Sequence, residues 1–204
     1  MEILMKNLSR DDAHKVLTGA VVPRPIALVS TKSPENVHNL APFSYFTAVS
    51  SSPAMILVSV ADRNGQKKDT LRNIERHPEF VVNVVTEDMA VPVNNAAADY
   101  RPDISEFDEV GLTPVPAKTV DCMAVLESPV RLECRLHQII PLASNHLVIG
   151  EVQLVYVQDD LYIPDYKINV EALRPLARIC GPYYAKLGEF MTCKRTFDPG
   201  KVIS

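Results

Sequence analysis

The stretch NLAPFSYFTAVSSSPAMILVSVADRNGQKKDT, Asn39 to Thr70, decides the fold. Its first part, residues 39–48, mixes polar and aromatic side chains as a half-buried strand does, and residues 54–60 are apolar enough for an inner strand. Three serines followed by Pro53 lie between these segments and predict a turn. The stretch therefore predicts a hairpin around which the rest of the chain is arranged.

The end of this stretch predicts an anion site. A short helix is expected from Thr70 to His77, because apolar residues recur at helical spacing there and a proline follows. Lys67 and Lys68 directly precede this helix. Free backbone N–H groups and the positive end of the helix dipole favour an anion at such a place. We expect that anion to be a phosphate.

Composition limits what the chain can be. With 204 residues, of which 47% are hydrophobic, it can bury a full core, and we expect one domain over residues 1–204. The net charge of −4 argues against nucleic-acid binding. The four cysteines form no C-x-x-C pair and the histidines no H-E-x-x-H motif, so no metal site is expected. No signal segment or membrane-spanning run is seen, so we expect a cytoplasmic protein with no membrane contact.

The flanking chain predicts more strands than helices. Ser9, with Asp12 three residues later, predicts the start of a helix that ends at Gly19 and covers the barrel. Apolar and β-branched runs predict further strands at residues 26–31, 80–85, 122–141 and 145–158, the third interrupted by Pro129 and the last two paired as a hairpin. About six strands with few long helices favour a mainly β fold with flanking helices, an antiparallel barrel whose closure removes sheet edges.

Two segments depart from the strand pattern. Residues 87–116 form a helical insertion, in which an alanine-rich helix over residues 87–100 precedes an acidic stretch, Glu106 to Glu109, expected to be a solvated face. Residues 160–204 form a tail rich in tyrosine and proline. The seven glycines form neither G-x-G-x-x-G nor a P-loop, so no dinucleotide fingerprint is present.

Four separated blocks carry a resemblance to a known family. In order and spacing they are similar to the flavin reductase-like, FMN-binding split-barrel family: PRPIALVST (23–31), NLAPFSYFTAVSSSPAMILVSV (39–60), KDTLRNI (68–74) with FVVNVV after it, and NHLVIGEV (145–152). The resemblance implies a six-stranded split barrel with Greek-key connections. It also implies a homodimer with FMN in a groove near the subunit interface.

The resemblance assigns roles to residues around the flavin ring. The family strand that matches this chain runs beside the ring, where backbone amides can bond the ring's polar edge. The matching residues are Phe43, Ser44, Tyr45, Phe46 and Thr47. A histidine matching His146 lies near the nicotinamide in related reductases, which makes His146 the candidate catalytic residue.

A second group is assigned to the ribityl phosphate. The turn matching Val49, Ser50 and Ser51 lies along the ribityl chain and the phosphate. Lys68 and Thr70 fit phosphate ligands, and Arg24 is a further phosphate or ring candidate. Each has a structural alternative. Turn serines usually bond their own backbone, adjacent lysines are usually solvated, and Asp69 could simply cap the helix.

Three functions stay open. The first is an NAD(P)H-dependent flavin reductase, in which hydride passes between NADH or NADPH and the flavin. The second is a flavoredoxin-like FMN electron carrier that works with small-molecule or protein donors and acceptors and has no nicotinamide activity. The third is a non-redox barrel that only binds a ligand. The first two cannot be separated, because the variable tail after Tyr162 shapes the nicotinamide side.

Overall fold

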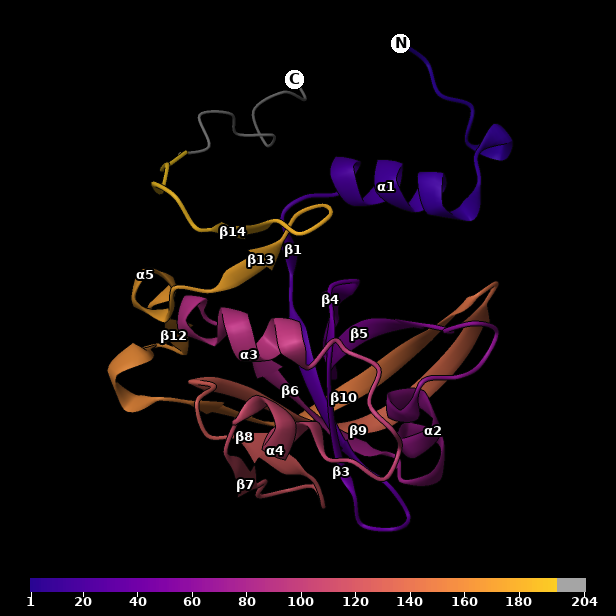
Figure 1. Cartoon of the computed structure of the whole chain (residues 1–204). Coiled ribbons are helices and arrows are strands. Elements are labelled where there is room, and N and C mark those ends of the chain that lie inside the picture. Colours follow the sequence, from indigo (N-terminus) through magenta and orange to yellow (C-terminus); the bar gives the residue numbers. More distant parts are fainter. Residues whose placement is uncertain (194–204) are drawn as a thin grey trace, which may run out of the picture.

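The computed structural model describes residues 1–193 and is built on an antiparallel split barrel (Figure 1). Its sheet has the strand order β3-β2-β6-β9-β10-β5-β4. The strands are β2 (Ala27–Lys32), β3 (His38–Phe43), β4 (Phe46–Ser51), β5 (Ala54–Ala61), β6 (Glu79–Val84), β9 (Val130–Leu142) and β10 (Asn145–Val157). Four strands separate β3 from β5 in this order, yet the two are in contact. The sheet therefore curls far enough to enclose a core.

The two predicted hairpins are confirmed. β4 pairs with β5 across Ser52 and Pro53, and β9 pairs with β10 across Ala143 and Ser144. The single strand predicted over residues 39–48 is wrong, because β3 ends at Phe43 and β4 begins at Phe46. Among the strands of residues 1–193, β3 pairs only with β2 and β4 only with β5, at opposite edges of the sheet. The chain crosses between these edges within two residues, and this crossing brings the edges together.

β2 separates two cores, which explains why its residues are apolar without alternation. Ala27 and Val29 face the barrel interior, together with Phe43, Val58 and Phe80. Leu28 belongs to a second core outside the barrel. A strand buried on both faces has no solvent side that would favour polar residues.

The insertion forms the cover of that second core. Its helices are η2 (Glu87–Met89), α3 (Ala90–Asn95) and α4 (Glu106–Val110), so the alanine-rich helix ends earlier than predicted. Buried side chains from these helices and from the segment after them pack on β2 and β3: Met89, Val93, Phe107 and Leu112. The short strands β7 (Pro114–Pro116) and β8 (Met123–Val125) follow. The predicted interruption of the long strand before β9 is confirmed.

The predicted N-terminal helix is confirmed, but its predicted place as a cover of the barrel is wrong, because it packs little against the described part of the chain. η1 (Met5–Asn7) precedes α1 (Arg10–Ala20), and the Ser9 side chain accepts the Asp12 N–H as its cap. Thr18 is the only buried residue of α1. In Figure 1, α1 lies apart from the barrel.

The C-terminal part consists of short elements. They are η3 (Asp159–Leu161), β11 (Tyr162–Ile163), β12 (Lys167–Ile168), α5 (Val170–Leu173), β13 (Leu176–Arg178) and β14 (Tyr184–Lys186), and β13 lies between β14 and β1 (Arg24–Pro25). Of the predicted tail, residues 194–204 lie outside the described residues. None of the helices within residues 1–193 has the length and apolarity that crossing a bilayer requires.

The helix α2 and the strand β10 are both packed tightly against the barrel core. α2 (Asp69–Arg76) confirms the predicted short helix, and its Leu71 and Ile74 are fully buried in the barrel core. Gly150 of β10 lies directly over Phe80, where a Cβ atom would lie 2.4 Å from the ring. Only glycine leaves room for this contact, so a small residue in β10 lets a large aromatic fill the barrel.

Candidate functional site

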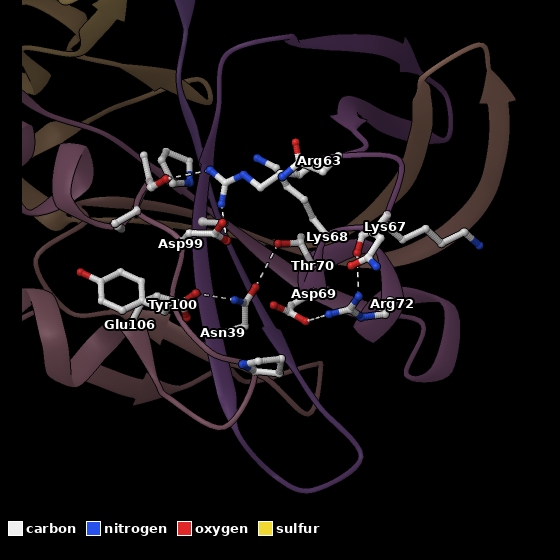
Figure 2. A pocket seen from close by; sticks show the side chains of 18 residues that line it. Asn39, Arg63, Lys67, Lys68, Asp69, Thr70, Arg72, Asp99, Tyr100 and Glu106 are labelled. Atoms are coloured by element: carbon white, nitrogen blue, oxygen red, sulfur yellow. Dashed lines mark hydrogen bonds and ion pairs between the residues drawn. The ribbon is translucent and has the colours of Figure 1, made fainter.

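A polar cavity of about 260 Å³ lies at the N-terminus of α2 (Figure 2). Its walls come from four places: the first turn of α2, the loop after β5, the strand β3, and the insertion between α3 and α4. Lys68 and Thr70, both predicted from the sequence, line this cavity. Asn39, Arg63 and Glu106 also line it, and none of these three was predicted from the sequence as a site residue.

Lys68 is the cation of this cavity that lacks a carboxylate partner within residues 1–193. Arg63 pairs with Asp99 at 2.5 Å, Lys67 pairs with Glu75 at 2.5 Å, and Arg72 pairs with Asp69. Lys68 is half-buried, and its Nζ lies 5.3 Å from the centre of the Phe43 ring. Burial, and then the charge of Arg63, lower the pKa of the Lys68 amine. A half-buried positive charge without a counter-charge favours an anionic ligand.

The start of α2 adds hydrogen-bond donors to this charge. Lys68 is the N-cap residue, in place of the predicted Asp69, and the side chain of Lys68 makes no capping hydrogen bond. The N–H groups of Leu71 and Arg72 donate to the Lys68 carbonyl. The N–H groups at the first positions of a helix have no partner within it, so those of Asp69 and Thr70 can serve a ligand.

Thr70 lines the cavity, but its hydroxyl already has a partner. The side chain is 1% exposed and donates to Oδ1 of Asn39 at 2.9 Å. Asn39 in turn donates from Nδ2 to the Glu106 carboxylate at 2.7 Å (Figure 2). The sequence resemblance made Thr70 a phosphate ligand, whereas its proton here points to Asn39.

Glu106 is not on a solvated face, and that prediction is wrong. It is 7% exposed, and its other carboxylate oxygen accepts the Leu40 N–H at 2.9 Å. Burial raises the pKa of Glu106, while the hydrogen bond from the Leu40 N–H opposes this rise. The partners of Glu106 lie 66 and 67 residues away in the sequence, so no local pattern could have identified it.

A second, apolar cavity of about 710 Å³ lies against the outer face of β4, β5 and β10. Among its lining residues are five that the sequence analysis placed at the site: Arg24, Ser44, Tyr45, Phe46 and Thr47. Leu57 and Leu147 are among its apolar lining residues, and Leu17 and Val21 come from α1 and its C-terminal end.

The two cavities lie close to each other at two points. Pro42 lines the polar cavity and Ser44 the apolar one, so the crossing from β3 to β4 runs between them. In addition, the Asp62 N–H donates to the Ser144 carbonyl at 2.8 Å, which joins the loop of the polar cavity to the hairpin of the apolar one. Phe43 itself lies in the barrel core beneath Lys68.

Arg24 is buried and engaged in holding two segments together. Its guanidinium donates to the carbonyls of Thr18 at 2.6 Å and Val21 at 2.5 Å, at the C-terminal end of α1, and also to the Ile179 carbonyl. Carbonyls at a helix C-terminus attract a cation. Only Nε lacks a partner among the described residues.

Val49, Ser50 and Ser51 line neither cavity. Val49 lies at an irregularity in the pairing of β4 with β5, and the Ser50 hydroxyl accepts the Ser52 N–H at 3.3 Å. They lie at the far end of the eight-residue strand β5 from the polar cavity, about 23 Å along a strand at ~3.3 Å per residue. Their contact with a ribityl phosphate stays a prediction.

His146 also lies outside the lining of both cavities. It stands opposite Val60 in the pairing of β10 with β5. Its Nδ1 is 3.5 Å from Oδ1 of Asp62, and neither atom has a hydrogen-bond partner among the described residues. The proposed role of His146 near a nicotinamide stays a prediction.

The structure is thus an antiparallel split barrel with a polar cavity at a helix start and an apolar cavity beside it. The sequence profile described as the flavin reductase like domain matches residues 19–173. The chain therefore belongs to the flavin reductase-like family.

Solved structures agree with this assignment. Nitrilotriacetate monooxygenase component B from Bacillus cereus is 37% identical, with a TM-score of 0.92 over 95% of this chain and 98% of that one. The 2-nitrobenzoate 2-nitroreductase NbaA of Pseudomonas fluorescens is 31% identical, with a TM-score of 0.89 over 98% of each chain. Flavoredoxin of Desulfovibrio vulgaris (Miyazaki F) is 25% identical, with a TM-score of 0.76 over 89% of this chain and 94% of that one.

Proposed function

We propose that this protein binds FMN, with the phosphate in the polar cavity and the isoalloxazine ring along Ser44 to Thr47 in the apolar cavity. The observation that carries the proposal is the pairing of a small cationic cavity with a larger apolar one, two residues apart at Pro42 and Ser44. FMN has the same division, a dianionic phosphate at one end and a planar ring system at the other. Family membership supports the same cofactor.

Each cavity would do different work for the cofactor. Lys68 and the free N–H groups of the first turn of α2 would bind the phosphate, since charge-assisted hydrogen bonds to an anion are the strong ones. Leu57 and Leu147 would exclude water from one side of the ring. The backbone amides from Ser44 to Thr47 would orient its polar edge.

The reaction that we propose is NAD(P)H-dependent flavin reduction. Bound FMN would supply the redox chemistry, taking a hydride from NADH or NADPH and passing electrons to a small-molecule or protein acceptor. This chain would contribute binding and alignment, and we keep His146 as the candidate residue on the nicotinamide side. A reducing, cytoplasmic setting belongs to the proposal, and the four free thiols support it.

An electron carrier is the second candidate, because one relative of similar fold is a flavoredoxin. Such a protein needs the FMN site but no room for a nicotinamide. The cavities described above support FMN equally in both cases.

We also propose that the protein is a homodimer. α1 leaves Leu17 48% exposed, and Val21 just beyond it is 59% exposed. Both also line the apolar cavity, which is open to solvent in a single copy. A second copy that covers these side chains would bury apolar surface and close the cavity over the flavin ring. Sedimentation should give a dimer that FMN stabilises, and a monomer with full FMN occupancy would exclude a shared site.

Two measurements test the function. The purified protein should be yellow or take up FMN at micromolar concentration, and a protein that does neither would contradict any flavin role and leave the non-redox barrel. With FMN bound, anaerobic addition of NADH or NADPH should bleach the flavin absorbance, and air should restore it. A flavin that dithionite bleaches but neither nucleotide does would favour the electron carrier.

A further inference from the structure

Glu106 is a buried carboxylate that forms no ion pair within the described part of the chain. Its partners are two hydrogen-bond donors, the Leu40 N–H and the Asn39 amide. Burying a carboxylate destabilises a fold unless its bonds compensate, and an apolar residue would avoid this cost. The role of Glu106 therefore lies in what these two bonds hold in place.

The first of these bonds fixes the orientation of Asn39. A side-chain amide has a donor end and an acceptor end, and a carboxylate can only accept. The NH₂ group of Asn39 must therefore face Glu106, at 2.7 Å, and its oxygen must face the other way. That oxygen accepts the Thr70 hydroxyl at 2.9 Å. Glu106 thus determines that the Thr70 hydroxyl meets the oxygen of the Asn39 amide and not its NH₂ group.

Thr70 connects Asn39 to the first turn of α2, which lines the polar cavity. It is the second residue of α2 and follows Lys68 by two positions. One turn later, Asn73 donates to the Thr31 hydroxyl at 3.1 Å, so α2 is tied to the barrel at two places. Both ties fix the direction in which the first N–H groups of α2 point.

We propose that Glu106 is a positioning residue for the phosphate. Through Asn39 and Thr70 it holds the first turn of α2, so that the free N–H groups and Lys68 face one point in the polar cavity. The ligand class is a phosphomonoester, and the inference rests on the proposed FMN function. The phosphate itself is bound by Lys68 and the helix start, and Thr70 acts through its bond to Asn39.

A purely structural role would have a different signature. Glu106, Asn39 and Thr70 line the polar cavity and not the apolar one. Riboflavin has the flavin ring and ribityl chain but no phosphate, so it reports on the apolar cavity alone. Loss of a positioning residue should weaken FMN and spare riboflavin, whereas general loosening of the fold should weaken both.

The experiment compares Glu106→Gln with Glu109→Gln. The Leu40 N–H and the Asn39 NH₂ donate to different oxygens of the Glu106 carboxylate. Glutamine replaces one of these oxygens with an NH₂ group, which cannot accept, so one of the two donors loses its acceptor at that place. Glu109 lies on the exposed side of the same helix and is the matched control. Thr70→Val removes the hydroxyl at nearly constant volume, and it tests the same relay if Glu106→Gln does not fold. Dissociation constants for FMN and riboflavin are measured by quenching of flavin fluorescence.

Glu106→Gln and Thr70→Val should each weaken FMN about tenfold, with riboflavin within about twofold, and the double variant should lose no more than Thr70→Val alone. Glu109→Gln should bind both flavins as the wild type does. Equal loss of both flavins, or unchanged FMN affinity in either relay variant, would overturn the positioning role while leaving the FMN site standing. A wild type that binds neither flavin would overturn the proposed function, and this inference with it.

Discussion

The polar and the apolar cavity differ in how the chain builds them, although neighbouring residues line them, Ala41 and Pro42 the polar cavity and Ser44 to Thr47 the apolar one. The polar cavity is small, about 260 Å³, and depends on charges and helix N–H groups gathered from four separate segments. The apolar cavity, about 710 Å³, is mainly the outer face of one hairpin and its neighbour β10. A flat sheet face offers area and little specificity, and a helix start offers directed donors. The comparison predicts that affinity for the phosphate and affinity for the ring can be changed separately.

Removing the unpaired cation should break the polar cavity alone and should have the largest effect. Lys68→Ala is expected to weaken FMN by about 1.5–3 kcal/mol, roughly one to two decades, because a charge-assisted contact to a phosphate is lost. Riboflavin affinity should change little. Titration of both flavins into wild type and variant measures the difference.

Lys67 provides the control for this prediction. It is the adjacent residue, has the same charge and lines the same cavity, but it is exposed and pairs with Glu75. Lys67→Ala should therefore leave FMN affinity within about threefold of wild type, as expected for a surface ion pair. If both variants weakened FMN equally, net charge alone would explain the effect and the particular geometry of Lys68 would not.

The packing of the barrel core, on which both cavities depend, can be tested by a substitution at Gly150. A Cβ at this position would lie 2.4 Å from the Phe80 ring, so Gly150→Ala should destabilise the protein by about 1–3 kcal/mol through overpacking. The melting temperature should fall by several degrees, while the ratio of FMN to riboflavin affinity should not change. Gly188→Ala is the control, because no atom of the described residues lies within 4 Å of a Cβ at that position. A changed ratio would mean that β10 affects the two cavities unequally.

The apolar cavity can be changed at Tyr45. Its ring lines this cavity and lies 6.4 Å from the His14 ring, measured between centroids. Tyr45→Ala should weaken FMN and riboflavin alike, by about 0.5–1.5 kcal/mol, if the ring packs on the flavin. Tyr45→Phe keeps the ring and should bind both as the wild type does. A loss limited to FMN would contradict the division of the ligand between the two cavities.

The sequence predicted the parts of this architecture that depend on neighbouring residues. The hairpins, α2 and the N-terminal cap at Ser9 follow from local patterns, and the four family blocks identified the split barrel. Contacts between distant segments could not be predicted in this way. In the sequence, Glu106 is one of several acidic residues in a short stretch. It becomes buried because α4 packs against β3.

The predicted site was also more compact in the sequence than in space. Val49, Ser50 and Ser51 lie within 20 residues of Lys68 in the sequence, yet they lie beside the beginning of β5, whereas Lys68 follows its end. The two-residue crossing after Phe43 interrupts a continuous polar-aromatic pattern, because nothing local to that pattern shows that its two halves pair at opposite sheet edges. The alternation of residues along a strand predicts which side chains are buried, but it does not predict which strand will pair with it.

The smallest effect should come from titrating Lys68. Burial lowers the pKa of its amine from the ordinary value of 10.5, so in the free protein the positive charge is lost earlier than usual as the pH rises. A bound phosphate favours the charged form, so affinity for FMN should fall as the pH rises through the lowered pKa of the free protein. A half-deprotonated Lys68 weakens a ligand that needs the charge by roughly twofold. The phosphate is already fully ionised above pH 7.5, because its second pKa is about 6.

The ratio of FMN to riboflavin affinity should therefore begin to decline at a pH below 10.5, and Lys68→Ala should show a flat ratio over the same range. A wild-type ratio that stays as flat as that of Lys68→Ala would mean that Lys68 does not contact the phosphate.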